Sequence, residues 1–278
     1  MIYSPLLGGI GNLNFIIATT YALALDNNDE AVFSTGLNSI TRRKNENWWF
    51  RTLYRKIARS TPRTKMTYKE PRFTYQKIPY YPNMKLQGYF QSPHYFNHRR
   101  QDILELFTDY KQDILTSLQL KLDLLPGKKI SIHIRRADYL KLQHVHHVLP
   151  MTYYKNAVEI MKKSLGADYK DYIFLVFSDD TEWCKKQDFF KKLPDVNFIE
   201  DSDPLTKGPV EVFQLYLMSM CDHNIIANSS FSWWGAYLNE NPNKIVVAPE
   251  TWFNKPPKGR GPPNWNTLYC KDWVKCSN

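Results

Sequence analysis

The chain has 278 residues, of which 43% are hydrophobic, 15% aromatic and 23% charged. This length and composition suffice for one large core or two cores of roughly 100 to 150 residues, and they argue against a disordered, collagen-like or membrane-bundle protein. No apolar stretch reaches the roughly 18 to 20 residues that span a bilayer, and the first residues do not resemble a secretory signal. The four cysteines form no C-x-x-C pair, so we read them as reduced thiols and expect a cytoplasmic protein.

The net charge of +10 is concentrated in one segment. Residues 41–77 carry enough basic residues to account for the whole excess, and aromatic residues are interleaved with them. Such a segment is typical either of a solvated surface or of a contact with an anionic partner. We treat it as an insertion and predict a peripheral contact with an anionic membrane surface, with no nucleic acid among the expected partners.

The opening of the chain predicts a strand, a glycine turn, a helix and a second strand. Residues 2–7 are apolar, residues 8–11 form the turn, residues 12–25 have helical apolar spacing, and residues 31–33 resume a strand. This order is Rossmann-like. NAD binding is not predicted, because Asn14 stands where the dinucleotide fingerprint requires its third glycine.

A long amphipathic helix is predicted from about residue 103 to 124, followed by the helix stop Pro126-Gly127. We place the domain boundary there, which gives an N-terminal domain of residues 1–126 and a C-terminal domain of residues 127–278. The second domain alternates strands and helices, which is typical of an α/β fold with a parallel sheet covered by helices. The predicted strands are 130–134, 172–177, 196–199, 224–227 and 245–248, and the predicted helices lie near 151–164, 180–192, 209–222 and 231–239.

The first of these strands has one polar face. Its apolar residues fall at 130, 132 and 134, so Ser131, His133 and Arg135 share the opposite face. An arginine can hold a phosphate through two parallel hydrogen bonds, so this face predicts an anion pocket. The alternative is an edge strand with a solvated polar face. Asp138 follows in the turn, where its carboxylate is either a partner of Arg136 or a base.

Two other strand ends are also polar. Ser178 and Asp179 follow the apolar strand 172–177, and a carboxylate at that place can accept from a ribose hydroxyl or a guanine edge; helix capping is the alternative. The serine-rich turn 228–232 runs into a helix whose N–H groups favour a phosphate, again with ordinary capping as the alternative. The tryptophans that follow, Trp233 and Trp234, are interpreted as packing residues.

Three motifs recur in a known order along the chain. They are Gly8-Gly9-Ile10-Gly11-Asn12 near the start, His133-Ile134-Arg135-Arg136-Ala137-Asp138-Tyr139 at mid-chain, and Asn228 to Trp234. Together they resemble the bacterial α-1,2-fucosyltransferases of glycosyltransferase family 11. The resemblance implies a GT-B-like α/β fold of two Rossmann-like domains facing a cleft, with the donor on the C-terminal domain. It implies inverting transfer of fucose from GDP-fucose to a galactose-type hydroxyl of a glycan in an α-1,2 linkage, without a metal or other cofactor.

The resemblance also implies roles for single residues. Arg135 would hold the β-phosphate, His133 the ribose side and Asp179 the guanine, while Arg136 orients the motif. Inverting transfer also requires a base for the acceptor hydroxyl, and for this role we favour Asp138, with Asn12 as an orienting group and His144, His146 and His147 as possible substitutes. The remaining donor-side residues are Ser229, Ser230 and Phe231 for the diphosphate and Gly9 and Gly11 at the N-terminal turn.

Two alternatives stay open at this stage. Asp201 and Asp203 form an Asp-x-Asp that would hold Mg²⁺ or Mn²⁺ in a metal-dependent GT-A transferase. The basic, aromatic segment 41–77 would instead suit a non-enzymatic glycan-binding or nucleic-acid-binding protein. Turnover of GDP-fucose separates an enzyme from a binding protein.

Overall fold

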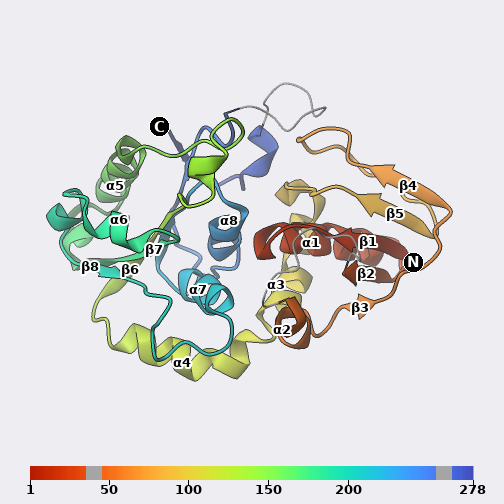
Figure 1. The fold of residues 1–278 in the computed structure, drawn as a ribbon, viewed down its shortest axis with the longest axis horizontal. Helices are drawn as coiled ribbons and strands as arrows, with labels where there is room; N and C mark the ends of the chain where they lie inside the picture. Colours follow the sequence, from red (N-terminus) through yellow and green to blue (C-terminus); the bar gives the residue numbers. More distant parts are fainter. Residues whose placement is uncertain (36–45, 255–264, 278) are drawn as a thin grey trace. The chain divides into compact units, whose positions relative to one another are not determined.

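The computed structural model of the chain describes residues 1–35, 46–254 and 265–277. The basic residues Arg42, Arg43 and Lys44 and the Pro-rich run 255–263 lie outside these ranges. The chain forms two compact α/β units, which are coloured along the sequence in Figure 1: Met1–Lys111 with Pro256–Cys270, and Gln112–Lys255 with Lys271–Asn278. No helix in the described part of the chain is long and apolar enough to span a bilayer.

The first unit opens with the predicted strand, turn, helix and strand. Its parallel sheet has the order β3-β2-β1-β5-β4, and α1 packs along β1. Asn14, at the position of the missing third glycine, accepts a hydrogen bond from the Tyr54 hydroxyl (2.7 Å) inside the core. The elements are β1 (Ile2–Leu6), α1 (Ile10–Asp26), β2 (Ala31–Thr35), α2 (Glu46–Arg51), β3 (Ala58–Arg59), β4 (Met66–Lys69), β5 (Met84–Gln87) and α3 (Arg100–Thr108).

The turn before α1 requires its first glycine. Gly8 has φ +87°, in the left-handed region, and a Cβ on it would lie 2.6 Å from Nδ2 of Asn12. Gly9 is extended and caps α1, so the helix begins at Ile10, two residues before the predicted start. Gly11 is buried in the first turn of the helix.

The basic segment is part of the first sheet, because it supplies both edge strands, β3 and β4. Three of its aromatic residues face inward, since Trp49, Phe50 and Tyr54 are at most 6% exposed, whereas Tyr75 is 37% exposed. All its described basic residues are exposed: Arg51, Arg55, Lys56, Arg59, Arg63, Lys65, Lys69, Arg72 and Lys77. Trp49, Phe50 and Tyr54 are therefore not available as a stacking platform for nucleic-acid bases.

The predicted long helix is two helices, α3 and α4 (Lys111–Asp123). The chain is interrupted at Asp109, whose carboxylate accepts from Arg55 Nε (2.5 Å) and contacts Lys56 Nζ (2.6 Å). The two compact units divide at Lys111, at the start of α4. The expected boundary, Pro126-Gly127, instead follows α4 inside the second unit, and the segment Pro256–Cys270 belongs to the first unit.

The second unit is a parallel sheet with the order β11-β10-β9-β6-β7-β8. The predicted strands and the helix-covered parallel sheet are confirmed; β11 was not predicted, and the helix expected at 180–192 is reduced to α6 and a 3-10 turn. The elements are β6 (Lys128–Ile134), α5 (Met151–Leu165), β7 (Tyr172–Ser178), α6 (Thr181–Lys185), β8 (Val196–Phe198), α7 (Val210–Ser219), β9 (His223–Ile225), α8 (Ser230–Tyr237), β10 (Val246–Pro249) and β11 (Val274–Cys276).

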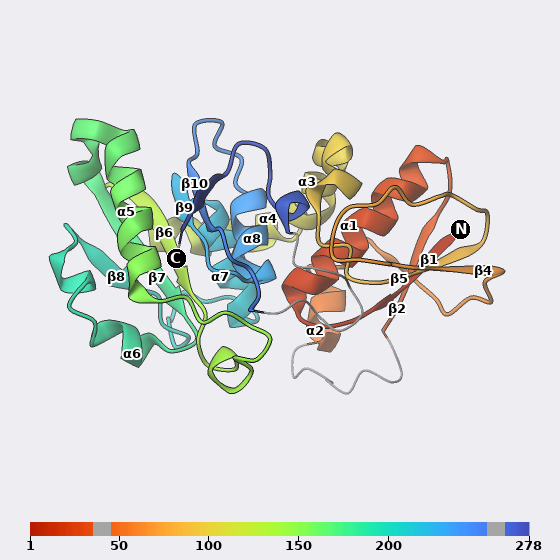
Figure 2. The ribbon, with the colours of Figure 1, turned by 90° about the horizontal axis from the view of Figure 1, so that it is seen from above.

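Helices cover both faces of this sheet. Figures 1 and 2 show α5 on one side and the α7–α8 pair on the other. Ile130, Ile132 and Ile134 of β6 pack in the same core cluster as Tyr153 of α5. The predicted packing role of Trp233 and Trp234 is confirmed, since both are fully buried. The carboxyl ends of β9, β6 and β7 therefore lie side by side at one edge, where open α/β sheets bind ligands.

Candidate functional site

The polar face of β6 is buried, because β6 lies between β9 and β7 in the middle of the sheet. Ser131 is 2% exposed and its Oγ accepts from Nδ2 of Asn224 on β9 (2.7 Å). His133 is 4% exposed and its ring lies 5.5 Å from that of Phe231, at the start of α8. The alternative of an edge strand with a solvated face is wrong.

His133 is a neutral group in this site. Burial, together with the nearby Arg135 cation, lowers the pKa of its imidazole from 6.5 to about 3. Within the described ranges its Nδ1 atom is buried and has no hydrogen-bond partner. A neutral imidazole with an unpaired nitrogen suits a hydroxyl group of a ligand better than a phosphate, which needs a cation.

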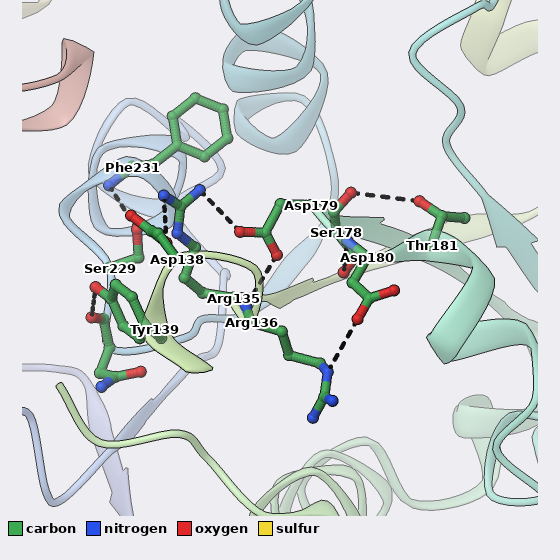
Figure 3. Close-up of polar contacts among 11 residues, drawn as sticks. Arg135, Arg136, Asp138, Tyr139, Ser178, Asp179, Asp180, Thr181, Ser229 and Phe231 are labelled. Carbon is green, nitrogen blue, oxygen red and sulfur yellow. Dashed lines mark hydrogen bonds and ion pairs between the residues drawn. The ribbon is translucent and has the colours of Figure 1, made fainter. Parts of the chain in front are cut away.

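Arg135 leaves the end of β6 and lies between two carboxylates, as Figure 3 shows. Its Nη2 atom is 2.8 Å from Oδ1 of Asp138, and its Nη1 atom is 3.1 Å from Oδ2 of Asp179. Burial alone would lower the pKa of the guanidinium, but the two carboxylates outweigh it and raise the pKa. Arg135 is therefore a permanent cation at the sheet edge.

Asp179 joins the ends of β6 and β7. Besides its contact with Arg135, its Oδ1 atom accepts the backbone N–H of Arg136 (2.8 Å). The helix cap after β7 is Asp180, which accepts from the N–H of Trp183 (3.3 Å), so neither Ser178 nor Asp179 caps α6. The capping alternative for these two residues is wrong.

The side chain of Arg136 points away from that of Arg135, toward α6. Its guanidinium lies 3.6 Å from the centre of the Trp183 ring and its Nε atom 3.3 Å from Oδ2 of Asp180. The expected alternative pairing of Asp138 with Arg136 is not observed, because Arg135 is the arginine that Asp138 contacts. Arg136 thus fastens the end of β6 to α6.

The serine turn leads into α8, and its residue Phe231 places its ring beside that of His133. Ser229 is the N-cap of α8, and its Oγ atom accepts from the N–H of Phe231 (3.3 Å), so the capping reading holds for this side chain. The preceding Asn228 is anchored: its carbonyl accepts from the Tyr139 hydroxyl (3.0 Å) and its amide donates to the His147 carbonyl (2.8 Å). These bonds tie the turn to the loop after Arg135, as Figure 3 shows for Tyr139.

The loop that follows Asp138 carries His144, His146 and His147, which the sequence suggests as possible substitutes for the base, but the ring packing inside this loop was not predicted. The rings of Tyr139 and His146 stack at 4.2 Å with an angle of 12°. Burial lowers the pKa of His146, although the nearby Asp138 acts in the opposite direction. The spacing of Tyr139 and His146 follows no helix or strand period, so no periodic signal reveals this stack.

Three predicted residues lie in the first unit: Gly9, Gly11 and Asn12. Oδ1 of Asn12 accepts from Nε2 of Gln91 (2.7 Å). All other predicted site residues lie in the second unit. The structure brings together, at the carboxyl ends of the strands, His133, Arg135, Asp138, Asp179 and the Ser229–Phe231 turn.

The Asp-x-Asp pair is engaged within the protein. Asp203 forms an ion pair with Lys121 of α4 and accepts the N–H of Leu205 (2.9 Å). Asp201 accepts from Nε2 of Gln214 on α7 (3.1 Å). No cluster of three or more His, Cys, Asp or Glu suited to a metal occurs among the residues that the structure describes. These contacts do not favour the metal-dependent GT-A alternative.

The chain is similar to known proteins over most of its length. The sequence profile of glycosyl transferase family 11 matches residues 54–277. The Escherichia coli O-antigen biosynthesis glycosyltransferase WbnK is 32% identical over 90% of this chain and 94% of its own length. The E. coli α-1,2-colitosyltransferase is 34% identical over 60% of this chain and 56% of its own length. Galactoside α-(1,2)-fucosyltransferase 2 of Gorilla gorilla gorilla is 30% identical over 56% of this chain and 45% of its own length.

The fold has relatives among solved structures. The NodZ α-1,6-fucosyltransferase soaked with GDP-fucose has a TM-score of 0.55 at 13% identity, with 88% of this chain and 94% of that chain covered. At this identity the likeness concerns the fold alone. It agrees with two parallel α/β units of the GT-B type.

Proposed function

The chain belongs to glycosyl transferase family 11, and on that premise we propose that it transfers fucose from GDP-fucose to a galactose-type hydroxyl of a glycan, with inversion and in an α-1,2 linkage. The observation that carries the proposal is the position of Arg135. This permanent cation lies at the carboxyl edge of a parallel sheet, beside a buried neutral histidine and a helix N-terminus. A nucleoside diphosphate offers a matching set of groups: anionic oxygens and ribose hydroxyls.

The donor diphosphate would contact Arg135 and the turn of Ser229, Ser230 and Phe231. Its charge grows as the sugar leaves, and fixed positive groups stabilise that charge without reorganisation. The buried, unpaired Nδ1 atom of His133 would form a hydrogen bond with a ribose hydroxyl. Asp179 remains our candidate for the guanine edge, since a carboxylate oxygen with one partner keeps a second lone pair.

Inversion requires a base that removes the proton of the acceptor hydroxyl while the hydroxyl attacks the sugar from the far side. We propose Asp138 for this role, because its side chain is 52% exposed and lies at the same edge as Arg135. Asn12 is our candidate for an orienting group. The proposal requires no metal, because Arg135 and the α8 N-terminus supply the positive charge.

Two statements about partners are part of the proposal. The acceptor is a galactose-containing glycan, as the names of the galactoside fucosyltransferase relatives suggest. The exposed basic residues of segment 41–77 would hold the protein at the cytoplasmic face of an anionic membrane. The name of the E. coli colitosyltransferase favours a second candidate, in which the transferred sugar is colitose.

The direct test is transfer to matched acceptors. The protein is incubated with GDP-fucose and a galactoside, and the same galactoside lacking only its 2-hydroxyl serves as the control. We expect fucosylated product and GDP release with the first acceptor and no product with the second. Equal product on both would contradict the α-1,2 linkage, and product only with a colitose donor would select the second candidate.

A further inference from the structure

Arg135 has two carboxylate partners that differ in how firmly they are held. The Asp179 side chain is 20% exposed, and its two oxygens bind two groups, the Arg135 guanidinium and the Arg136 backbone N–H. Asp138 is 52% exposed and lies three residues after Arg135, at the start of a 3-10 turn that it does not cap with its side chain. In Figure 3 the two carboxylates approach the guanidinium at different nitrogen atoms.

The loop that carries Asp179 is also held more firmly than the loop that carries Asp138. The Asp179 contact joins the ends of two neighbouring strands, β6 and β7, whose register is fixed over their whole length. Within the described part of the chain, the Asp138 carboxylate has one hydrogen-bond or ion-pair partner, which is Arg135. Displacing Asp138 therefore breaks one exposed ion pair, whereas displacing Asp179 also removes the acceptor of a backbone N–H.

From this asymmetry we infer that Asp179, in addition to the guanine contact proposed above, is a positioning residue that holds the Arg135 guanidinium in place, and that Asp138 occupies the place of a donor phosphate until the donor displaces it. The inference rests on the proposed function and adds the order of events at Arg135: the guanidinium first contacts Asp138 and then the donor phosphate. A diphosphate carries more negative charge than one carboxylate, so it competes successfully for the Nη2 side of Arg135. The same exchange frees the carboxylate of Asp138 to accept a proton from the acceptor.

The inference predicts opposite effects for two chemically identical substitutions. Asp138→Asn removes the competing anion, so GDP should bind about twofold to fivefold more tightly, the range expected from one exposed ion pair. Asp179→Asn keeps an acceptor for the Arg136 N–H but loses the charge that holds Arg135, so GDP should bind about tenfold more weakly. Asp168→Asn is the matched control, because Asp168 precedes β7 at the opposite edge of the sheet and carries the same charge.

Binding is measured by titration calorimetry with GDP, inorganic pyrophosphate and guanosine, beside thermal unfolding of each variant. Pyrophosphate separates positioning of Arg135 from a guanine contact, since it has no base. We expect Asp179→Asn to weaken pyrophosphate binding and Asp138→Asn to strengthen it, with guanosine unchanged by Asp138→Asn and GDP unchanged by Asp168→Asn.

The outcomes distinguish a failure of the proposed function from a failure of the roles inferred for Asp138 and Asp179. A parent protein that binds neither GDP nor pyrophosphate overturns the proposed function, and this inference with it. A parent that binds both, with Asp138→Asn binding no more tightly than Asp168→Asn, overturns the displacement alone. A loss of guanosine and GDP binding in Asp179→Asn with pyrophosphate unaffected leaves Asp179 with the guanine contact alone and overturns its positioning role.

Discussion

Replacing His133 should change how the stability of the second unit depends on pH. The pKa of this buried imidazole is about 3 in the folded protein, against an ordinary value of 6.5. Between these values the unfolded chain binds a proton that the folded chain does not bind, so stability is lost as the pH falls below 6.5. The loss is about 1.4 kcal/mol per pH unit, or roughly 2.5 kcal/mol between pH 6 and pH 4.

The substitution His133→Asn removes this proton and keeps a side chain that can form hydrogen bonds. Urea unfolding is followed by tryptophan fluorescence at pH 7, 6, 5 and 4 for the parent and the variant. The stability difference between them should shift in favour of the variant by the stated amount as the pH falls. Ser131→Ala is the control, because Ser131 lies on the same buried strand face and does not titrate. A parent-minus-variant difference that stays constant with pH would refute the neutral, buried state of His133.

Three other outcomes follow from the structure. Transfer activity should survive EDTA, and its loss in EDTA with recovery in Mn²⁺ would return the choice to Asp201 and Asp203. Gly8→Ala should lower the melting temperature more than Gly166→Ala: both glycines have positive φ, but only the Cβ at Gly8 meets another side chain, that of Asn12. Binding to anionic vesicles should weaken steeply with salt, since the screening length is about 10 Å at 0.1 M; equal binding to neutral vesicles at every salt level would exclude a role for segment 41–77.

Much of the fold could be predicted from local patterns. Alternating strands and helices identified the parallel sheet of the second unit, because buried parallel strands are continuous apolar runs such as 172–177. The short strands β3, β4, β5 and β11 were not predicted. β3, β4 and β11 lie at sheet edges, and in β4 and β5 the alternation of apolar and polar residues covers only four residues, too few to stand out from the surrounding loops. The break at Asp109 was missed for a related reason, since its contacts with Arg55 and Lys56 join residues far apart in sequence.

The sequence predicted which residues form the candidate site but not the contacts among them. The alternation in β6 correctly separated Ser131, His133 and Arg135 from the core face. It did not reveal that Arg135 is enclosed by two carboxylates or that Arg136 stacks on Trp183, because those contacts depend on which strands are neighbours and how the loops turn. The glycine that the turn requires is Gly8, which only the backbone angle distinguishes from Gly9.

The central claim is that Arg135 anchors the donor diphosphate, and Arg135→Lys tests it most directly. Lysine keeps the charge but loses the planar fork, so it should not restore function. We predict that kcat with GDP-fucose falls about a hundredfold or more, equivalent to about 3 kcal/mol of barrier, in both Arg135→Lys and Arg135→Ala. Their melting temperatures should stay near the parent's, whereas Arg136→Ala should unfold at a lower temperature because it loses the Trp183 stack and the Asp180 contact. Folded Arg135 variants that turn over GDP-fucose within a fewfold of the parent would contradict the account.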